Sequence, residues 1–303
     1  MQKLYHCTCC EKVETEDRIV TSNNYASNLS YGDNKVVNSK YTIFTFLPLI
    51  IITHLSRFMN LYFIIIGCLQ LWKDVSPVNP LTTWGPIVVI FAIAFIREGI
   101  DDYSKHQQDK LINNRKYAII RDHKRMSIKS QDIHVGDIVI LNREAESPCD
   151  LVLLYSSNVP AGNAFIETAN LDGESSLKEI RAIKEVQNKS EEGLQAETVI
   201  VKCAPPSPEV YRLIGHIYLN SMDSEKYSLD QQQLVQAGVH LKNAEYIYGL
   251  AVYTGKHTKL GLNASPPPVK WTQLERFIDK CSIIIFCCQI IIAIIYGSIA
   301  NLM

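Results

Sequence analysis

The sequence predicts a bundle of three membrane-spanning α-helices joined to a soluble all-β domain. Two observations predict this fold class. Apolar residues are concentrated in three stretches, 43–72, 85–96 and 283–300, whereas residues 101–276 have the polar composition of a soluble protein. Within that polar part, short runs rich in β-branched and apolar residues alternate with turn signals, which is typical of a small β-sandwich or a distorted barrel.

The first apolar stretch is interrupted by charge. A spanning helix needs about 20 mostly apolar residues, and 45–72 is long enough, but His54 and Arg57 lie midway. A charge at the centre of the bilayer costs several kcal/mol. We therefore expect an interfacial segment over 44–57, with Arg57 at the water boundary, followed by a buried stretch over 58–72.

Two further spans are expected, from about Leu81 to Ile100 and from about Cys281 to Ala300. Their orientation follows from the loops, because basic loops stay in the cytosol. The connection 73–83 contains one Lys and one Asp, whereas 101–125 contains seven Lys and Arg residues. The sequence therefore predicts a multi-pass membrane protein whose N-terminus and polar middle are cytosolic. It does not indicate which membrane.

The polar middle is expected to begin with a helical stalk over Asp101–Asn113, which continues the second span. Residues 184–197 are charged and predict another helix. The strand candidates between turn signals are Tyr117–Arg121, Asp137–Leu141, Leu151–Tyr155, Val199–Lys202, Tyr211–Leu219 and Tyr246–Tyr253.

These expectations divide the chain into seven parts. They are a cytosolic N-terminal tail (1–40), an interfacial segment with the first span (41–72), an exoplasmic loop (73–83), the second span with its stalk (84–112), the all-β domain (113–265), a linker (266–280) and the third span (281–300).

Charge and cysteine content narrow the function classes. The formal net charge of −1 gives no basis for a nucleic-acid partner. The nine cysteines lie in apolar runs, singly, or in one cluster at Cys7, Cys9 and Cys10, which does not resemble a disulfide framework. That cluster lacks a second group of ligands at zinc-finger spacing, so no metal site is expected.

The stretch from Ile166 to Lys178 carries the most chemical information. It reads Ile-Glu-Thr-Ala-Asn-Leu-Asp-Gly-Glu-Ser-Ser-Leu-Lys, and we expect a strand that ends in Asp-Gly-Glu-Ser. Glycine permits a tight turn, and a carboxylate on a projecting loop can orient a water molecule and take its proton. A β-turn with two solvated acids, Asp172 and Glu174, explains the same residues. The chemistry of the residues alone leaves both interpretations open.

This stretch closely resembles the actuator-domain signature of P-type ATPases, in which a Gly-Glu loop hydrolyses an aspartyl phosphate. The Asn-Leu-Asp-Gly-Glu form is similar to the phospholipid-transporting, or flippase, group, because cation pumps usually carry Thr where Asp172 stands. Ser175 replaces the usual Thr and keeps the hydroxyl. The resemblance covers most of the chain from about Lys40. Further matches occur at Phe46-Leu47-Pro48, Asn60-Leu61-Tyr62-Phe63, 75–80, 97–103, 113–115, 135–139, 148–151 and 252–259.

The resemblance implies roles for several residues. Glu174 would be the dephosphorylating carboxylate, with Asp172, Gly173 and Ser175 shaping its loop, and residues 113–265 would form the distorted jelly-roll-like actuator domain. Gln70 and Asn60 would line a phospholipid path; flippases often carry a Gln-Gln pair where this chain has Gln70-Leu71, so head-group choice stays open. An interfacial polar residue explains Gln70 equally well.

The family's Asp-Lys-Thr-Gly phosphorylation motif does not occur in the sequence. ATP and Mg²⁺ are implied for the complete enzyme, but no site for either is identified here, and the chain alone is expected to lack ATPase activity. Three hypotheses follow: the N-terminal portion of a phospholipid-transporting ATPase, a short non-enzymatic membrane protein that binds the same partners, such as the family's accessory glycoprotein subunit, or part of a divergent cation pump.

Overall fold

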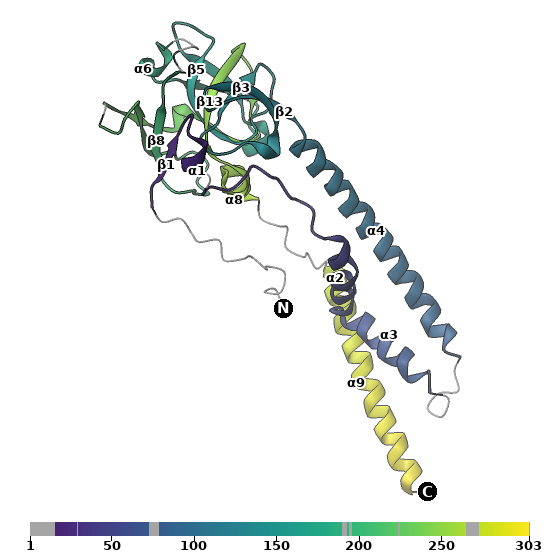
Figure 1. The fold of residues 1–303 in the computed structure, drawn as a ribbon. Helices are drawn as coiled ribbons and strands as arrows, with labels where there is room; N and C mark the ends of the chain where they lie inside the picture. Colours follow the sequence, from purple (N-terminus) through teal and green to yellow (C-terminus); the bar gives the residue numbers. More distant parts are fainter. Residues whose placement is uncertain are drawn as a thin grey trace. The chain divides into compact units, whose positions relative to one another are not determined.

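The computed structural model describes residues 16–28, 30–72, 79–189, 193, 196–223, 225–264 and 273–302. These residues form two compact units (Figure 1). The β-rich unit contains the described residues up to Val37 and those from Asp109 to 264, and the helical unit contains the remainder. The predicted fold class, apolar helices with an all-β domain, is confirmed.

A six-stranded antiparallel sheet lies at the centre of the β-rich unit, with strand order β11-β5-β13-β4-β2-β3. Its sequence alternates between two buried faces. On β5, Val152 and Leu154 belong to one core, whereas Leu151 and Leu153 belong to the other. The strands are β2 (Lys116–Arg121), β3 (Lys124–Lys129), β4 (Ile138–Asn142), β5 (Asp150–Ser156), β11 (Leu234–Val235) and β13 (Tyr246–Tyr253).

Two smaller sheets cover these faces. A four-stranded sheet of β1 (Arg18–Thr21), β8 (Val199–Cys203), β9 (Gly215–Leu219) and β10 (Lys226–Leu229) supplies apolar residues to the first core. A three-stranded sheet of β12 (His240–Leu241), β6 (Asn163–Glu167) and β7 (Leu177–Arg181) supplies them to the second. The sheets are separate, so the described strands form a layered sandwich and not a closed barrel.

Short helical segments connect the strands. They are α1 (Tyr25–Asn28), α5 (Ala169–Asp172), α6 (Lys184–Gln187) and α8 (Lys259–Asn263), with 3₁₀ turns η2 (Ser130–Asp132), η3 (Gln231–Gln233) and η4 (Gly255–His257). The strand expected over Tyr211–Leu219 begins only at Gly215, and the helix expected over 184–197 ends its first segment at Gln187. Residues 190–192, 194 and 195 lie outside the described residues.

Within the expected N-terminal tail (1–40), the part that the structure describes, from residue 16 on, contains a paired strand. From Arg18 to Thr21 it pairs with β8, and Val20 is fully buried. Arg18 is 1% exposed; its guanidinium donates to the Val252 carbonyl (3.0 Å) and lies 4.4 Å from the centroid of the Tyr31 ring. Sequence reasoning missed this strand because its polar residues are buried by pairing with chain far away in the sequence.

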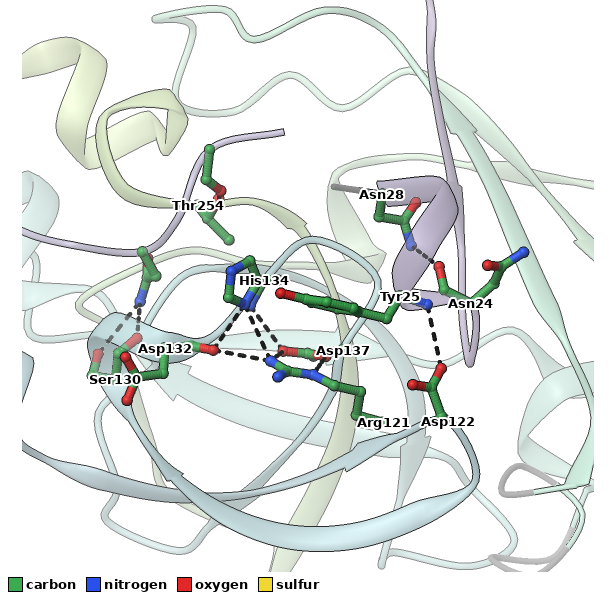
Figure 2. Close-up of polar contacts among 12 residues, drawn as sticks. Asn24, Tyr25, Asn28, Arg121, Asp122, Ser130, Asp132, His134, Asp137 and Thr254 are labelled. Atoms are coloured by element: carbon green, nitrogen blue, oxygen red, sulfur yellow. Dashed lines mark hydrogen bonds and ion pairs between the residues drawn. The ribbon is translucent and has the colours of Figure 1, made fainter. Parts of the chain in front are cut away.

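A second group of contacts holds α1 against the domain (Figure 2). Arg121 forms an ion pair with Asp137 (2.6 Å), and its guanidinium lies 4.8 Å from the centroid of the Tyr25 ring. The backbone N–H of Tyr25 donates to Asp122 (3.3 Å), and the ring packs edge-on against His134. The segment 16–37 is therefore an integral part of the β-rich unit.

The helical unit contains α2 (Ile43–Leu55), α3 (Phe58–Leu69), α9 (Gln273–Leu302) and most of α4 (Leu81–Asn113), whose last turn belongs to the β-rich unit. The continuous α4 includes the predicted stalk. The predicted linker 266–280 is helical from Gln273 on, and its first part, with the proline run, lies outside the described residues. Residues 73–78 of the predicted exoplasmic loop also lie outside them.

Two helices in the described part of the chain, Leu81–Asn113 and Arg276–Ala300, are long and apolar enough to cross a membrane. The pair α2 and α3 would make a third span, but it is bent by 96°. The bend occurs where Arg57 precedes α3 as its N-cap, which confirms the expected break in the first apolar stretch. Within the unit, Tyr62 donates to Gln289 (2.6 Å) and Trp84 donates to the Gly67 carbonyl (3.0 Å).

Replacing Arg18 tests whether the N-terminal strand is integral. We expect Arg18→Met to lower the free energy of unfolding by about 3 kcal/mol, because it removes buried, charge-assisted hydrogen bonds. The exposed Arg212, paired only with Glu209 three residues away among the ion pairs described, is the matched control; Arg212→Met should cost no more than about 0.5 kcal/mol. Urea unfolding followed by circular dichroism measures both. Equal effects would contradict the assignment.

Candidate functional site

The Gly-Glu loop connects β6 to β7 in the three-stranded sheet. The pairing of Glu167 with Leu177 fixes its two ends. The strand ends at Glu167, earlier than expected, and the single helical turn α5 follows. Gly173 closes this turn with φ +76°, in the left-handed region that glycine adopts at low cost. The loop therefore places Glu174 directly after a fixed reversal of the backbone.

The carboxylate of Asp172 is the centre of the loop. Lys178 and Tyr211 each donate to Oδ2 at 2.5 Å, and the Thr168 hydroxyl lies 3.0 Å from both oxygens. The backbone N–H of Glu174 donates to Oδ1 (2.9 Å). One carboxylate thus joins the start of the loop, its tip, β7 and a distant segment of chain.

Hydrogen bonds and charge favour the ionised form of Asp172. The hydrogen bond from Lys178, with those from Tyr211 and the Glu174 backbone, holds the pKa of Asp172 well below its usual range. The same interaction raises the pKa of Lys178 well above its usual value. A carboxylate of such low basicity is a poor proton acceptor, so Asp172 is suited to a structural role.

Glu174 has the opposite surroundings. Its side chain is 59% exposed, compared with 17% for Asp172, and Lys178 Nζ lies 3.2 Å from its carboxylate. Ser175 follows it in the exposed stretch before β7. The arrangement presents one carboxylate to the outside on a loop whose base is fixed by another, which is the geometry needed to meet a reacting group on a separate surface.

Sequence reasoning missed two of the residues that shape this site. Lys178 is the last residue of the stretch from Ile166 to Lys178. A basic residue four positions after Glu174, at the end of the same hairpin loop, is the local pattern that could have indicated this contact. Tyr211 lies 39 residues from Asp172 in the chain, so no local pattern could reveal it.

The base of the loop rests on a turn at 236–239. Asn170 Nδ2 donates to the Gly238 carbonyl (3.1 Å). This turn is anchored by the fully buried Asp150, whose two oxygens accept the backbone N–H groups of Ala237 (2.8 Å) and Lys259 (2.7 Å). Burial raises the pKa of Asp150 to about 6, although both N–H donors oppose the rise.

Asn60 lies on α3 and Gln70 directly follows that helix, both in the helical unit. The rise of a helix places them about 15 Å apart. Asn60 Nδ2 donates to the His54 carbonyl across the bend (3.0 Å). The Oε1 atom of Gln70 is buried and has no hydrogen-bond partner among the described residues. The structure thus gives Asn60 a local structural contact and leaves a buried acceptor at Gln70.

Within the described ranges, no group of three or more His, Cys, Asp or Glu side chains is arranged to hold a metal ion. The Asp172 carboxylate is also saturated by protein donors. The residues that the structure describes therefore do not fit a Mg²⁺ site.

Comparisons with known proteins agree with this architecture. Residues 111–262 match the P-type ATPase actuator domain, and residues 17–84 match the phospholipid-translocating ATPase N-terminal family. The chain is 38% identical to phospholipid-transporting ATPase 2 of Arabidopsis thaliana, over 89% of this chain and 24% of the relative. It is 35% identical to human phospholipid-transporting ATPase IG (84% and 22%) and to mouse phospholipid-transporting ATPase FetA (90% and 23%).

The actuator-domain match over residues 111–262, which contain the Gly-Glu loop, identifies a P-type ATPase. Within that class, the chain belongs to the phospholipid-transporting family. It is a membrane protein and spans 22–24% of the length of the relatives named here. The N-terminal family match begins at residue 17, which agrees with a structured segment from Arg18 on.

Substitution of two glycines separates backbone strain from steric clash. A Cβ added at Gly173 would meet nothing within 4 Å. Gly173→Ala should therefore lower the free energy of unfolding only by the cost of a left-handed alanine, about 1 kcal/mol. At Gly255 (φ +54°) a Cβ would lie 2.6 Å from the Asp33 carbonyl, and we expect Gly255→Ala to cost about 3 kcal/mol. Urea unfolding compares them. Equal losses would contradict the open geometry at Gly173.

Asp150 predicts a pH dependence of stability. Its folded pKa of about 6 exceeds the unfolded value of 3.8, so its contribution is fully present below pH 3.8 and is lost as the pH rises through 6. Between pH 5 and 7 the wild-type chain should lose about 1 kcal/mol more unfolding free energy than Asp150→Asn. Urea unfolding of both chains at the two pH values measures the difference. Parallel pH profiles would contradict an ionisable Asp150 in the core.

Proposed function

We propose that this chain serves a complete ATP-driven phospholipid-transporting ATPase, in which Glu174 activates the water that hydrolyses the aspartyl phosphate. The observation that carries the proposal is the exposed Glu174 carboxylate on a loop fixed by Asp172. The names of the relatives and the actuator-domain match support it. Because the relatives are phospholipid-transporting ATPases, a cation pump has no comparable support.

The proposed step follows from the two carboxylates. Asp172, compensated by Lys178 and Tyr211, stays ionised and holds the loop. Glu174 accepts a proton from water as the water oxygen bonds to phosphorus, and the bond between phosphorus and the acyl oxygen of the phosphorylated aspartate breaks. Inorganic phosphate leaves. Lys178 Nζ, which holds Asp172, also lies 3.2 Å from the Glu174 carboxylate and so links the two acids of the loop.

The membrane part of the proposal concerns the lipid. The basic 101–125 segment favours a cytosolic β-rich unit, and movement of that unit in the catalytic cycle would act on the helices joined to it. Gln70, with its buried acceptor at the end of α3, is proposed to contact a phospholipid head group. Asn60, whose amide donates to the His54 carbonyl, would maintain the bend at the start of α3 on the same path. An accessory glycoprotein subunit is a proposed partner. The expectation that the 303-residue chain alone hydrolyses no ATP stays a prediction.

Phosphoenzyme decay in the complete protein tests the role of Glu174. After labelling with ATP and a chase with unlabelled ATP, Glu174→Gln should form the phosphoenzyme normally and lose it at least about 100-fold more slowly, since general-base catalysis contributes about 10²–10⁴-fold. Glu179→Gln is the matched control, an exposed carboxylate on β7 paired with Arg181; it should decay at the wild-type rate.

Phosphoenzyme decay at the wild-type rate in Glu174→Gln would contradict the proposal. A complete protein that never forms a phosphoenzyme would instead favour the non-enzymatic, partner-binding alternative.

A further inference from the structure

The connection between β8 and β9, residues 204–214, contributes Tyr211 to the Gly-Glu loop. The Tyr211 hydroxyl donates to Asp172 Oδ2 (2.5 Å) and accepts from Lys178 Nζ (3.0 Å). The Lys178 ammonium also lies 4.7 Å from the centroid of the Tyr211 ring. Since β9 belongs to the four-stranded sheet and β7 to the three-stranded sheet, this phenol joins the loop to the opposite cover of the central sheet.

Side chains from the rest of the unit hold this connection by its backbone carbonyls. It also contains Pro205, Pro206 and Pro208, which restrict its backbone. The four contacts are Tyr253 to the Ala204 carbonyl (2.6 Å), Lys259 to Ser207 (3.1 Å), Asn263 to Pro208 (2.7 Å) and Gln236 to Val210. The phenol is therefore delivered from a constrained support although Tyr211 itself is 45% exposed.

Gln236 links the two supports of the loop. It is only 4% exposed, and its amide donates to the carbonyl of Val210, the residue before Tyr211. Two residues later, the Gly238 carbonyl accepts from Asn170 on α5. The turn at 236–238 thus braces both the segment that carries Tyr211 and the helical turn that carries Asp172.

We propose that Tyr211, supported by Gln236, is a positioning residue for Glu174. The inference rests on the proposed role of Glu174 in dephosphorylation. Asp172 Oδ1 accepts the Glu174 backbone N–H. The position of the Asp172 carboxylate therefore fixes the position of the Glu174 backbone. Thr168, Glu174 and Lys178 all belong to the same hairpin and move with it. Tyr211 is the donor to Asp172, among the contacts described, that comes from outside this hairpin, on the connection between β8 and β9.

Phosphoenzyme decay in the complete protein tests this inference. Tyr211→Phe removes one hydroxyl and keeps the ring beside Lys178. Decay should slow about 10-fold, in line with one charge-assisted hydrogen bond, while phosphoenzyme formation is unchanged. Gln236→Leu, which frees the Val210 carbonyl without touching the hairpin, should slow decay in the same direction.

A matched control and a double variant separate positioning from loss of structure. Tyr227, on the edge strand β10, also donates its phenol to a carboxylate, that of Glu225 (3.0 Å), and has no described contact with the Gly-Glu loop. Tyr227→Phe should leave decay unchanged. In a Glu174→Gln background, Tyr211→Phe should cause no further slowing, because no carboxylate remains to be positioned.

The possible results are distinct. Wild-type decay in Tyr211→Phe, with slow decay in Glu174→Gln, overturns the positioning role and leaves the proposed function intact. Additive slowing in the double variant also overturns it, because Tyr211 would then act independently of Glu174. Wild-type decay in Glu174→Gln removes the proposed function and, with it, the reaction that Tyr211 would serve.

Discussion

The central sheet of the β-rich unit is apolar on both faces, so both faces must be covered. Neighbouring residues on β5, such as Leu151 and Val152, point into different cores. Neither cover is one continuous stretch of sequence: β1 comes from the N-terminal segment, and β12 comes from chain that follows β10. Each Å² of apolar surface that is buried contributes about 25 cal/mol to stability. This burial therefore holds together segments that are far apart in the sequence.

This layering positions the chemistry. The Gly-Glu loop lies at the end of a hairpin in one cover, β6 and β7, and the hairpin is held to the central sheet by residues such as Ile166 and Ile180. The loop itself contributes little to the core. Its order comes from polar contacts that converge on Asp172. A fixed base with a polar, exposed tip is consistent with the proposed role, in which the loop meets a separate surface.

Much of this architecture could be predicted from local sequence. The strand Tyr246–Tyr253 has the predicted bounds because it is a continuous β-favouring run. The break before α3 follows from the cost of placing Arg57 in a bilayer. The Gly-Glu loop was found through its family signature, and its role stays a proposal.

The rest depends on contacts between distant segments. Arg18 is buried by rings and carbonyls supplied by other parts of the chain, so its polar sequence suggested a tail. The sequence predicts a strand that ends in Asp-Gly-Glu-Ser, but the strand ends at Glu167. Asn170 pairs with Gly238 and Asp172 with Tyr211, and these contacts favour a helical turn. Non-local hydrogen bonds overrode the local preference at the functional site itself.

The most direct measurement is hydrogen–deuterium exchange of the complete protein with and without beryllium fluoride, an analogue of the phosphoryl group. If the Gly-Glu loop meets the aspartyl phosphate, exchange should slow across residues 168–178 on adding the analogue and stay constant in β10, an edge strand of the four-stranded sheet. Protection absent from 168–178, while other parts of the protein respond to the analogue, would contradict the account.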